Sequence, residues 1–88
     1  MSDIEAAFGK AVGDVEQLPE RPDNQDLLRL YALFKQATQG DVAGDRPGMM
    51  EFVRRAKYDA WAGLQGTPQE DAMQSYIDVV EELKAAQA

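Results

Sequence analysis

Neither cysteine nor histidine occurs among the 88 residues of this chain. The lack of cysteine excludes a disulfide framework, a thiolate nucleophile and a cysteine-based zinc site. The lack of histidine removes the commonest general base at neutral pH and the commonest metal ligand. The sequence also contains no nucleophile elbow, phosphate-binding glycine loop or calcium-binding loop. We therefore expect no catalytic residues, no metal site and no cofactor.

Long apolar runs are missing as well. No stretch approaches the roughly 20 apolar residues that a membrane-spanning helix needs, and the chain does not open with a basic segment followed by an apolar one. These features predict a soluble, cytoplasmic protein without stable membrane insertion. A chain of 88 residues with 44% hydrophobic residues can form one modest core, so residues 1–88 are expected to be a single domain.

The net charge of −7 comes from 16 acidic and 9 basic residues, and it argues against nucleic acid or an anionic membrane surface as a partner. The charges are unevenly distributed, because six of the nine basic residues lie between Arg29 and Lys57, where only three acidic residues oppose them. That segment carries +3 and the rest of the chain −10. This pattern fits either a site for a small anion or ordinary solvated helix faces.

Helical periodicity and end signals predict the first two helices. Ser2, with a glutamate three residues later, forms a capping box that opens the first helix, and Pro19 ends it. Asp23 is the expected N-cap of the second helix, which runs to Gln39 before Gly40 supplies a left-handed stop.

Two further helices follow a turn-rich segment. The third is expected between Met49 and Leu64, with an inward apolar stripe of Met49, Phe52, Ala56, Ala60 and Leu64. In the fourth, Thr67 is the expected N-cap, Pro68 the first helical residue and Glu70 the capping-box partner. No segment alternates as a strand would. The predicted fold class is therefore all-α, a four-helix antiparallel bundle.

The second helix has more apolar surface than one packing face requires. Its apolar residues fan over about 220°, whereas a stripe little wider than about 100° is enough to pack on one side. Tyr31 and Lys35 form an i,i+4 pair on the surplus flank, and Phe34 adjoins them. A ring beside an ammonium suits a flat base joined to a phosphate. The alternative is a pair of core aromatics with a lysine that snorkels to solvent.

The third helix shows a comparable surplus face. Arg54, Lys57, Tyr58 and Trp61 recur at spacings of three, four and seven residues, which places them on one side of a helix. Two cations with two aromatics again fit a phosphate next to an apolar group or a base. The alternative, which the residues alone favour slightly, is a basic face with a tryptophan packed into the core. On the residues alone, the sequence indicates a helical bundle with a candidate anion-plus-apolar site.

A series of short motifs runs along most of the chain. They are Tyr31–Thr38 (YALFKQAT), Gly40-Asp41, Arg46-Pro47-Gly48, Lys57–Trp61 (KYDAW), Leu64, Gly66, Glu70–Met73 and Tyr76-Ile77. In this order and spacing they resemble the acyl-CoA-binding protein family. The resemblance implies a four-helix bundle that binds medium- to long-chain fatty acyl-CoA thioesters as an intracellular carrier.

The resemblance also implies a binding site. Tyr31, Lys35 and Lys57 would surround the adenine and 3′-phosphate of the coenzyme. Phe34 would lie beside the base, and Tyr76 would close the site from the last helix. The acyl chain would follow a groove lined by apolar residues of the first three helices, namely Phe8, Ala11, Leu27, Leu28 and Met49.

Three positions depart from the family pattern. Phe34 stands where many members have tyrosine, and Glu16 and Val53 stand where lysine is frequent. We hypothesise that Arg54, the neighbour of Val53, partly compensates for the missing lysine and contributes to the ligand site.

Two other functions compete with the carrier. A protein-interaction module of the same fold would have a weakened ligand site and use its acidic surface for a partner. An acyl-CoA hydrolase would need a pair of groups to activate water, and the sequence offers no convincing pair. The carrier reading predicts a monomer that binds long-chain acyl-CoA, contacts acyl-CoA-using enzymes transiently and binds no nucleic acid.

Overall fold

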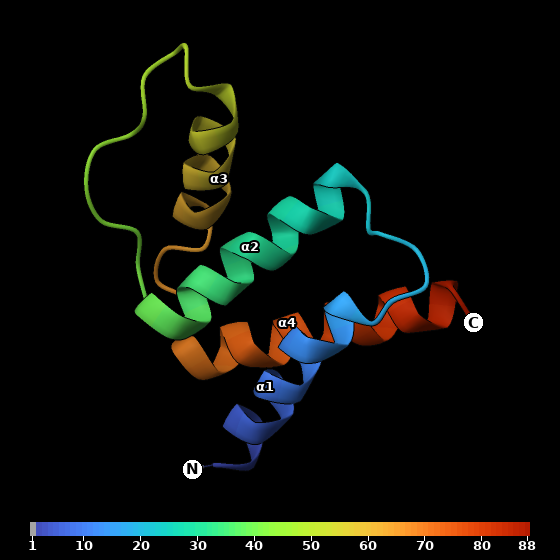
Figure 1. Cartoon of the computed structure of the whole chain (residues 1–88). Helices are drawn as coiled ribbons and strands as arrows, with labels where there is room; N and C mark the ends of the chain where they lie inside the picture. The colour runs from blue at the N-terminus through green and yellow to red at the C-terminus, as the bar shows by residue number, and fades with distance from the viewer. Residues whose placement is uncertain (1) are drawn as a thin grey trace.

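The computed structural model describes residues 2–88, and within them all regular secondary structure is helical. Its helices are α1 (Asp3–Glu16), α2 (Asn24–Gln39), α3 (Phe52–Ala62) and α4 (Gln69–Ala86). Helices α2 and α4 pack together, α1 packs on α4, and α3 packs on α2 alone (Figure 1). The molecule is flat, with extents of 38 × 30 × 15 Å. The predicted all-α, four-helix fold is confirmed.

The starts of α1 and α2 agree with the sequence. The Ser2 hydroxyl accepts the Glu5 backbone N–H at 3.3 Å and donates to the Glu5 carboxylate at 3.0 Å. A carboxylate oxygen of Asp23 accepts the backbone N–H of Asp26 at 2.8 Å. Gly40 ends α2 with a φ of 80°, a conformation that glycine adopts without steric cost. Helix α1 ends at Glu16, a little before the expected stop at the following proline.

The prediction for α3 was partly wrong. The helix begins at Phe52 instead of Met49, because residues 48–51 form a turn in which the Glu51 N–H bonds to the Gly48 carbonyl at 3.0 Å. Met49 and Phe52 do not face inward, since they are 75% and 72% exposed. The first turn of α3 extends past α2, the one helix on which α3 packs (Figure 1). The helix also ends at Ala62 rather than two residues later.

The predicted start of α4 was also wrong in its details. Pro68, not Thr67, occupies the N-cap position, and no side chain caps the helix. Pro68 has extended backbone with ψ of 147°, so it precedes the helix instead of opening it. The Thr67 carbonyl accepts a hydrogen bond from the Gln36 side chain at 2.8 Å. Glu70 forms no capping box, because Thr67 is held in this tertiary contact outside the helix.

The core lies among α1, α2 and α4. Phe8 of α1 meets Tyr76 of α4 edge-on, with ring centroids 5.2 Å apart and an interplanar angle of 78°. Most other core side chains are small or branched aliphatics: Ala11, Leu30, Leu33, Ala37, Ala72, Val79 and Val80. Helix α3 contributes no buried residue, so it lies against the outside of this core.

A polar network joins the end of α2 to the connection between α3 and α4. The Gln36 side chain, which is 0% exposed, donates to an Asp41 carboxylate oxygen at 2.9 Å and to the Thr67 carbonyl at 2.8 Å. The same Asp41 oxygen accepts the Gly66 backbone N–H at 2.8 Å. The Gly66 N–H first, and then the Gln36 amide, lower the pKa of Asp41. Two loops that are distant in the sequence are thereby fixed to one helix end.

An ion-pair cluster between α1 and α4 makes stability depend on pH. Asp14 accepts from Lys84 at 2.6 Å and from Lys10 at 2.9 Å. These hydrogen bonds, the one from Lys84 first, lower the pKa of Asp14. A carboxyl with a lowered folded-state pKa stabilises the fold above its unfolded pKa of about 3.9, and that contribution is lost as the pH falls through the folded pKa.

We therefore expect Asp14→Asn to melt at a lower temperature than the wild type at neutral pH. The difference in melting temperature between the wild type and the Asp14→Asn variant should become smaller as the pH is lowered below about 4. Circular dichroism melts across the acid range would measure it, with Asp45→Asn, an exposed loop carboxylate, as control. A wild type and an Asp14→Asn variant that differ by the same amount at every pH would contradict this assignment.

Candidate functional site

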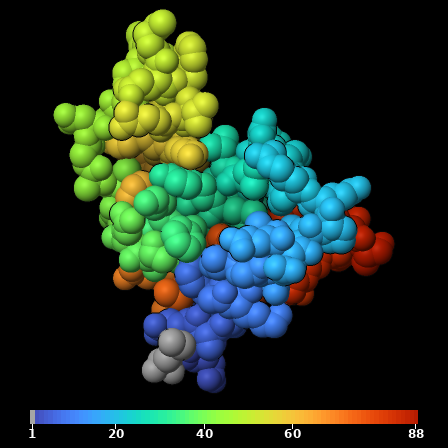
Figure 2. All heavy atoms as spheres, viewed as in Figure 1, coloured from blue at the N-terminus to red at the C-terminus, as the bar shows by residue number. Residues whose placement is uncertain are grey.

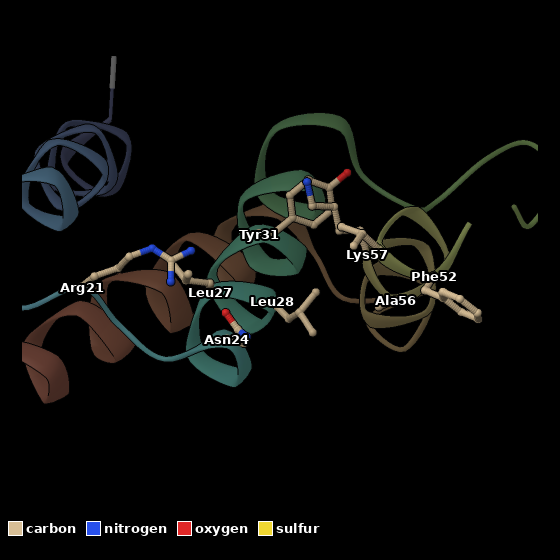
Figure 3. A pocket seen from close by; sticks show the side chains of 9 residues that line it. Arg21, Asn24, Leu27, Leu28, Tyr31, Phe52, Ala56 and Lys57 are labelled. Carbon is tan, nitrogen blue, oxygen red and sulfur yellow. The ribbon is translucent and has the colours of Figure 1, made fainter. Parts of the chain in front are cut away.

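An open cleft of about 620 Å³ lies between the start of α2 and the first half of α3 (Figure 3). Its volume falls within the range of about 300–1,000 Å³ typical of small-molecule sites. The cleft is lined by Arg21, Asn24, Leu27, Leu28, Tyr31, Phe52, Val53, Ala56 and Lys57. Figure 3 shows the cations Arg21 and Lys57 at opposite ends, with the leucines of α2 between them. The cleft therefore combines an apolar wall with positive charge at both ends.

Two lysines meet one aromatic ring at the Lys57 end of the cleft. The Lys57 Nζ atom lies 5.1 Å from the centroid of the Tyr31 ring, and the Lys35 Nζ atom lies 5.8 Å from it. Lys35 is also 5.8 Å from the Trp61 ring. Within residues 2–88, neither lysine forms an ion pair. The charges therefore remain available to an anionic group, and the rings offer a stacking surface.

Helix geometry explains how this cluster forms. Tyr31 and Lys35 are one turn apart on α2, so their side chains share a face. Helix α3 crosses α2 and supplies Lys57. The Trp61 Nε1–H donates to the Gly40 carbonyl at 2.8 Å, which fixes the end of α3 to the end of α2. The cluster thus depends on the packing of these two helices.

A second aromatic group leads from the surface of α2 into the core. The Phe34 ring, 36% exposed, stacks on Phe8 with centroids 6.0 Å apart. Phe8 in turn meets Tyr76, which is only 5% exposed. Burial first, and then the negative charge of Glu16, raise the pKa of Tyr76. Tyr76 is therefore a neutral phenol at physiological pH, packed behind the phenylalanines.

Four of the residues expected to bind a ligand line the cleft: Tyr31, Lys57, Leu27 and Leu28. Lys35 adjoins them through the Tyr31 ring. Phe8 and Ala11 instead lie in the core, at 7% and 4% exposure, and do not line this cleft. Their part in binding an acyl chain stays a prediction, as does that of the buried Tyr76 at a coenzyme site.

Met49 and Arg54 lie near the cleft without lining it. Met49 projects into solvent. Arg54 pairs with Glu51 one turn away on the exposed side of α3, while its neighbour Val53 lines the cleft. The proposed compensation by Arg54 for a missing lysine therefore requires its side chain to leave Glu51, and it stays a prediction.

Sequence reasoning missed Arg21, Asn24, Phe52 and Ala56 as cleft residues. A signal existed for two of them. Asn24 precedes Leu28 by four residues and Tyr31 by seven, so it shares their helix face. Ala56 adjoins Val53 on α3 in the same way. Arg21 lies outside any helix, and only the folded arrangement brings it to the cleft.

The whole chain has clear relatives. A family model described as acyl CoA binding protein (ACBP) matches residues 5–80. Acyl-CoA-binding protein homolog 1 of Caenorhabditis elegans is 44% identical over 79 residues, covering 90% of this chain and 92% of that protein. The crystal structure of ACBP from Moniliophthora perniciosa is 43% identical with a TM-score of 0.88, covering 100% of this chain and 86% of that one. Enoyl-CoA delta isomerase 2 of Rattus norvegicus is also 44% identical over 79 residues, 90% of this chain, but these make up only 20% of its length.

Proposed function

Because the chain belongs to the acyl-CoA-binding protein family, we propose that it binds medium- to long-chain fatty acyl-CoA thioesters as a carrier and performs no chemistry on them. One observation supports this most directly: the apolar wall at Leu27 and Leu28 and the Lys57 ammonium beside the Tyr31 ring belong to one cleft. Lys35 adjoins that cleft across the same ring. An acyl-CoA has the same division, with a long apolar tail and a phosphorylated, aromatic head.

The lysine end of the cleft suits the coenzyme head. The ammonium groups of Lys35 and Lys57 would donate charge-assisted hydrogen bonds to the 3′-phosphate. The faces of Tyr31 and Phe34 would pack against the adenine. Phe34 lacks the hydroxyl that many family members have here, so this contact would rest on the ring alone. The head contacts would distinguish the thioester from a free fatty acid.

The acyl chain would lie along the apolar wall. Leu28 of α2 and Ala56 of α3 line the cleft together, so a chain placed there would contact both helices. Burial of each methylene contributes up to about 0.8 kcal/mol, which makes affinity rise with chain length. As a carrier, the protein would act as a cytoplasmic monomer that shields the thioester and passes it to acyl-CoA-using enzymes.

A calorimetric titration with a C16 acyl-CoA, with CoA alone and with the free C16 acid tests the proposal. We expect one-to-one binding of the thioester, with each fragment at least about a hundredfold weaker, because head and tail contribute jointly. If the folded protein bound no thioester, Glu16, Phe34 and Val53 would mark a lost site. The protein-interaction module would then be the better interpretation.

A further inference from the structure

Four large apolar side chains project from one short segment of the surface. Met49, Met50, Phe52 and Val53, here called the apolar tip, are 75%, 85%, 72% and 68% exposed. Among residues 2–88, the next most exposed large apolar side chain is Phe34, at 36%. Figure 2 shows the start of α3 projecting from the body of the molecule. Exposed apolar groups gathered in this way mark a surface that contacts something other than water.

Polar contacts hold the apolar tip in place. Arg46 in the preceding loop forms two hydrogen bonds with Asp59 of α3, at 2.8 and 2.7 Å. The Tyr58 hydroxyl donates to the Gly44 carbonyl at 3.0 Å. Glu51 accepts the Gly48 backbone N–H at 3.2 Å. The tip is therefore presented on a braced loop and helix start, and its exposure is built into the fold.

The net charge of −7 by itself disfavours an anionic membrane, but the charge around the tip has the opposite sign to that of the rest of the protein. Arg55 and Lys57 follow the tip within one helical turn, and neither forms an ion pair within the described part of the chain. Residues 29–57 carry +3, whereas the remainder carries −10. An anionic surface would attract this region and repel the rest, so the molecule would approach with the tip first. Apolar side chains combined with arginine and lysine are typical of segments that lie in a bilayer interface.

We propose that the apolar tip is a peripheral docking site for a lipid bilayer with anionic headgroups, from which the protein takes up its ligand. The protein would lie on the surface of the bilayer without spanning it, because no helix between residues 2 and 88 is long and apolar enough to cross a membrane. The uptake step rests on the proposed function, since an acyl-CoA is an amphiphile that resides in bilayers. The docking step stands on the tip itself.

The tip and the ligand cleft are continuous. Phe52 and Val53 belong to the tip and also line the cleft beside Leu28 and Ala56. With the tip in the headgroup region, the mouth of the cleft would face the acyl chains. A tail leaving the bilayer would then pass along Phe52 and Val53 to the apolar wall with little exposure to water.

Met49 and Met50 allow docking to be tested apart from ligand binding, because neither lines the cleft. The double variant M49S/M50S is compared with M49L/M50L, which keeps the apolar character. Cosedimentation with acyl-CoA-free vesicles of phosphatidylcholine, with and without phosphatidylserine, measures docking. The rate of transfer of a C16 acyl-CoA out of vesicles of the same composition measures uptake, and calorimetry measures affinity in solution.

We expect M49S/M50S to bind phosphatidylserine-containing vesicles at least about tenfold more weakly than the wild type and to take up acyl-CoA correspondingly more slowly. Its affinity in solution should stay within about twofold of wild type, M49L/M50L should behave as wild type, and vesicles without phosphatidylserine should bind less protein. Equal vesicle binding by the serine variant and the wild type would overturn the proposal, as would an uptake rate independent of vesicle concentration. If the wild type bound vesicles that contain no acyl-CoA but did not bind acyl-CoA itself, the docking site would stand and the carrier function would be refuted.

Discussion

Replacing Lys57 by alanine is expected to weaken the binding of a C16 acyl-CoA by roughly 10- to 100-fold, because a hydrogen bond to a charged group contributes about 1.5–3 kcal/mol. Lys57 lies 5.1 Å from the Tyr31 ring and is one of two ammonium groups at this end of the cleft. Alanine would leave Lys35 alone to hold the phosphate. Since Lys57 is exposed and forms no ion pair within residues 2–88, the melting temperature should hardly change.

Calorimetry with the whole ligand and with its parts shows where the loss arises. Binding of CoA alone should weaken by a similar factor, whereas any binding of the free fatty acid should not. The affinity of the Lys57→Ala variant should also fall less steeply with added salt, because one charge contact is gone. Lys10→Ala is the matched control, since Lys10 lies on α1 and pairs with Asp14. Unchanged thioester affinity in Lys57→Ala would remove this lysine from the site.

Replacing Gln36 by leucine is expected to lower the free energy of unfolding by about 1–3 kcal/mol. Leucine has a similar size but cannot donate to Asp41 and the Thr67 carbonyl, which accept from Gln36 at 2.9 and 2.8 Å. The Thr67 carbonyl would lose its side-chain donor, and Asp41 would keep only its hydrogen bond from Gly66. Asp41 is exposed and can bond to water instead, and the substitution also removes the buried Gln36 Oε1, which has no partner within residues 2–88. The expected loss is therefore that of two hydrogen bonds.

Urea unfolding followed by circular dichroism measures this loss. Gln39→Leu is the control, because Gln39 is exposed near the end of the same helix; its effect should stay within about 0.5 kcal/mol. The polar network would not contribute to stability if Gln36→Leu unfolded at the same urea concentration as the wild type, with the same slope of unfolding free energy against urea concentration. A change in slope alone would instead indicate an altered denatured state.

The sequence predicted those parts of the fold that are determined locally. The limits of α2 follow from Asp23 and Gly40, because a capping carboxylate and a glycine with positive φ act over a single turn. The Ser2 cap of α1 succeeded for the same reason. The prediction of Thr67 as the N-cap of α4 was wrong, because the Thr67 carbonyl bonds to Gln36, a residue 31 positions earlier in the chain. No local pattern contains such a contact.

The candidate site shows the same division. The pairing of Tyr31 with Lys35 follows from helix periodicity and is present in the structure. The position of Lys57 beside Tyr31 depends on how α3 crosses α2. Periodicity could not predict it, and the resemblance to a family did. Apolar spacing likewise could not distinguish a residue that packs in the core, such as Phe8, from one that is exposed, such as Met49. Both positions satisfy the same pattern, and only the packing partners of each helix differ.

Helix α3 packs on α2 alone and contributes no buried side chain, so we expect the fold to consist of two tiers of unequal stability. The inner tier of α1, α2 and α4 encloses the aliphatic core, whereas α3 can open locally at a smaller cost in free energy. An acyl chain lying between Leu28 and Ala56 would give α3 the hydrophobic interior that it lacks. Ligand binding and the packing of α3 on α2 would then be coupled. The protein would hold α3 in place most firmly when an acyl chain fills the cleft.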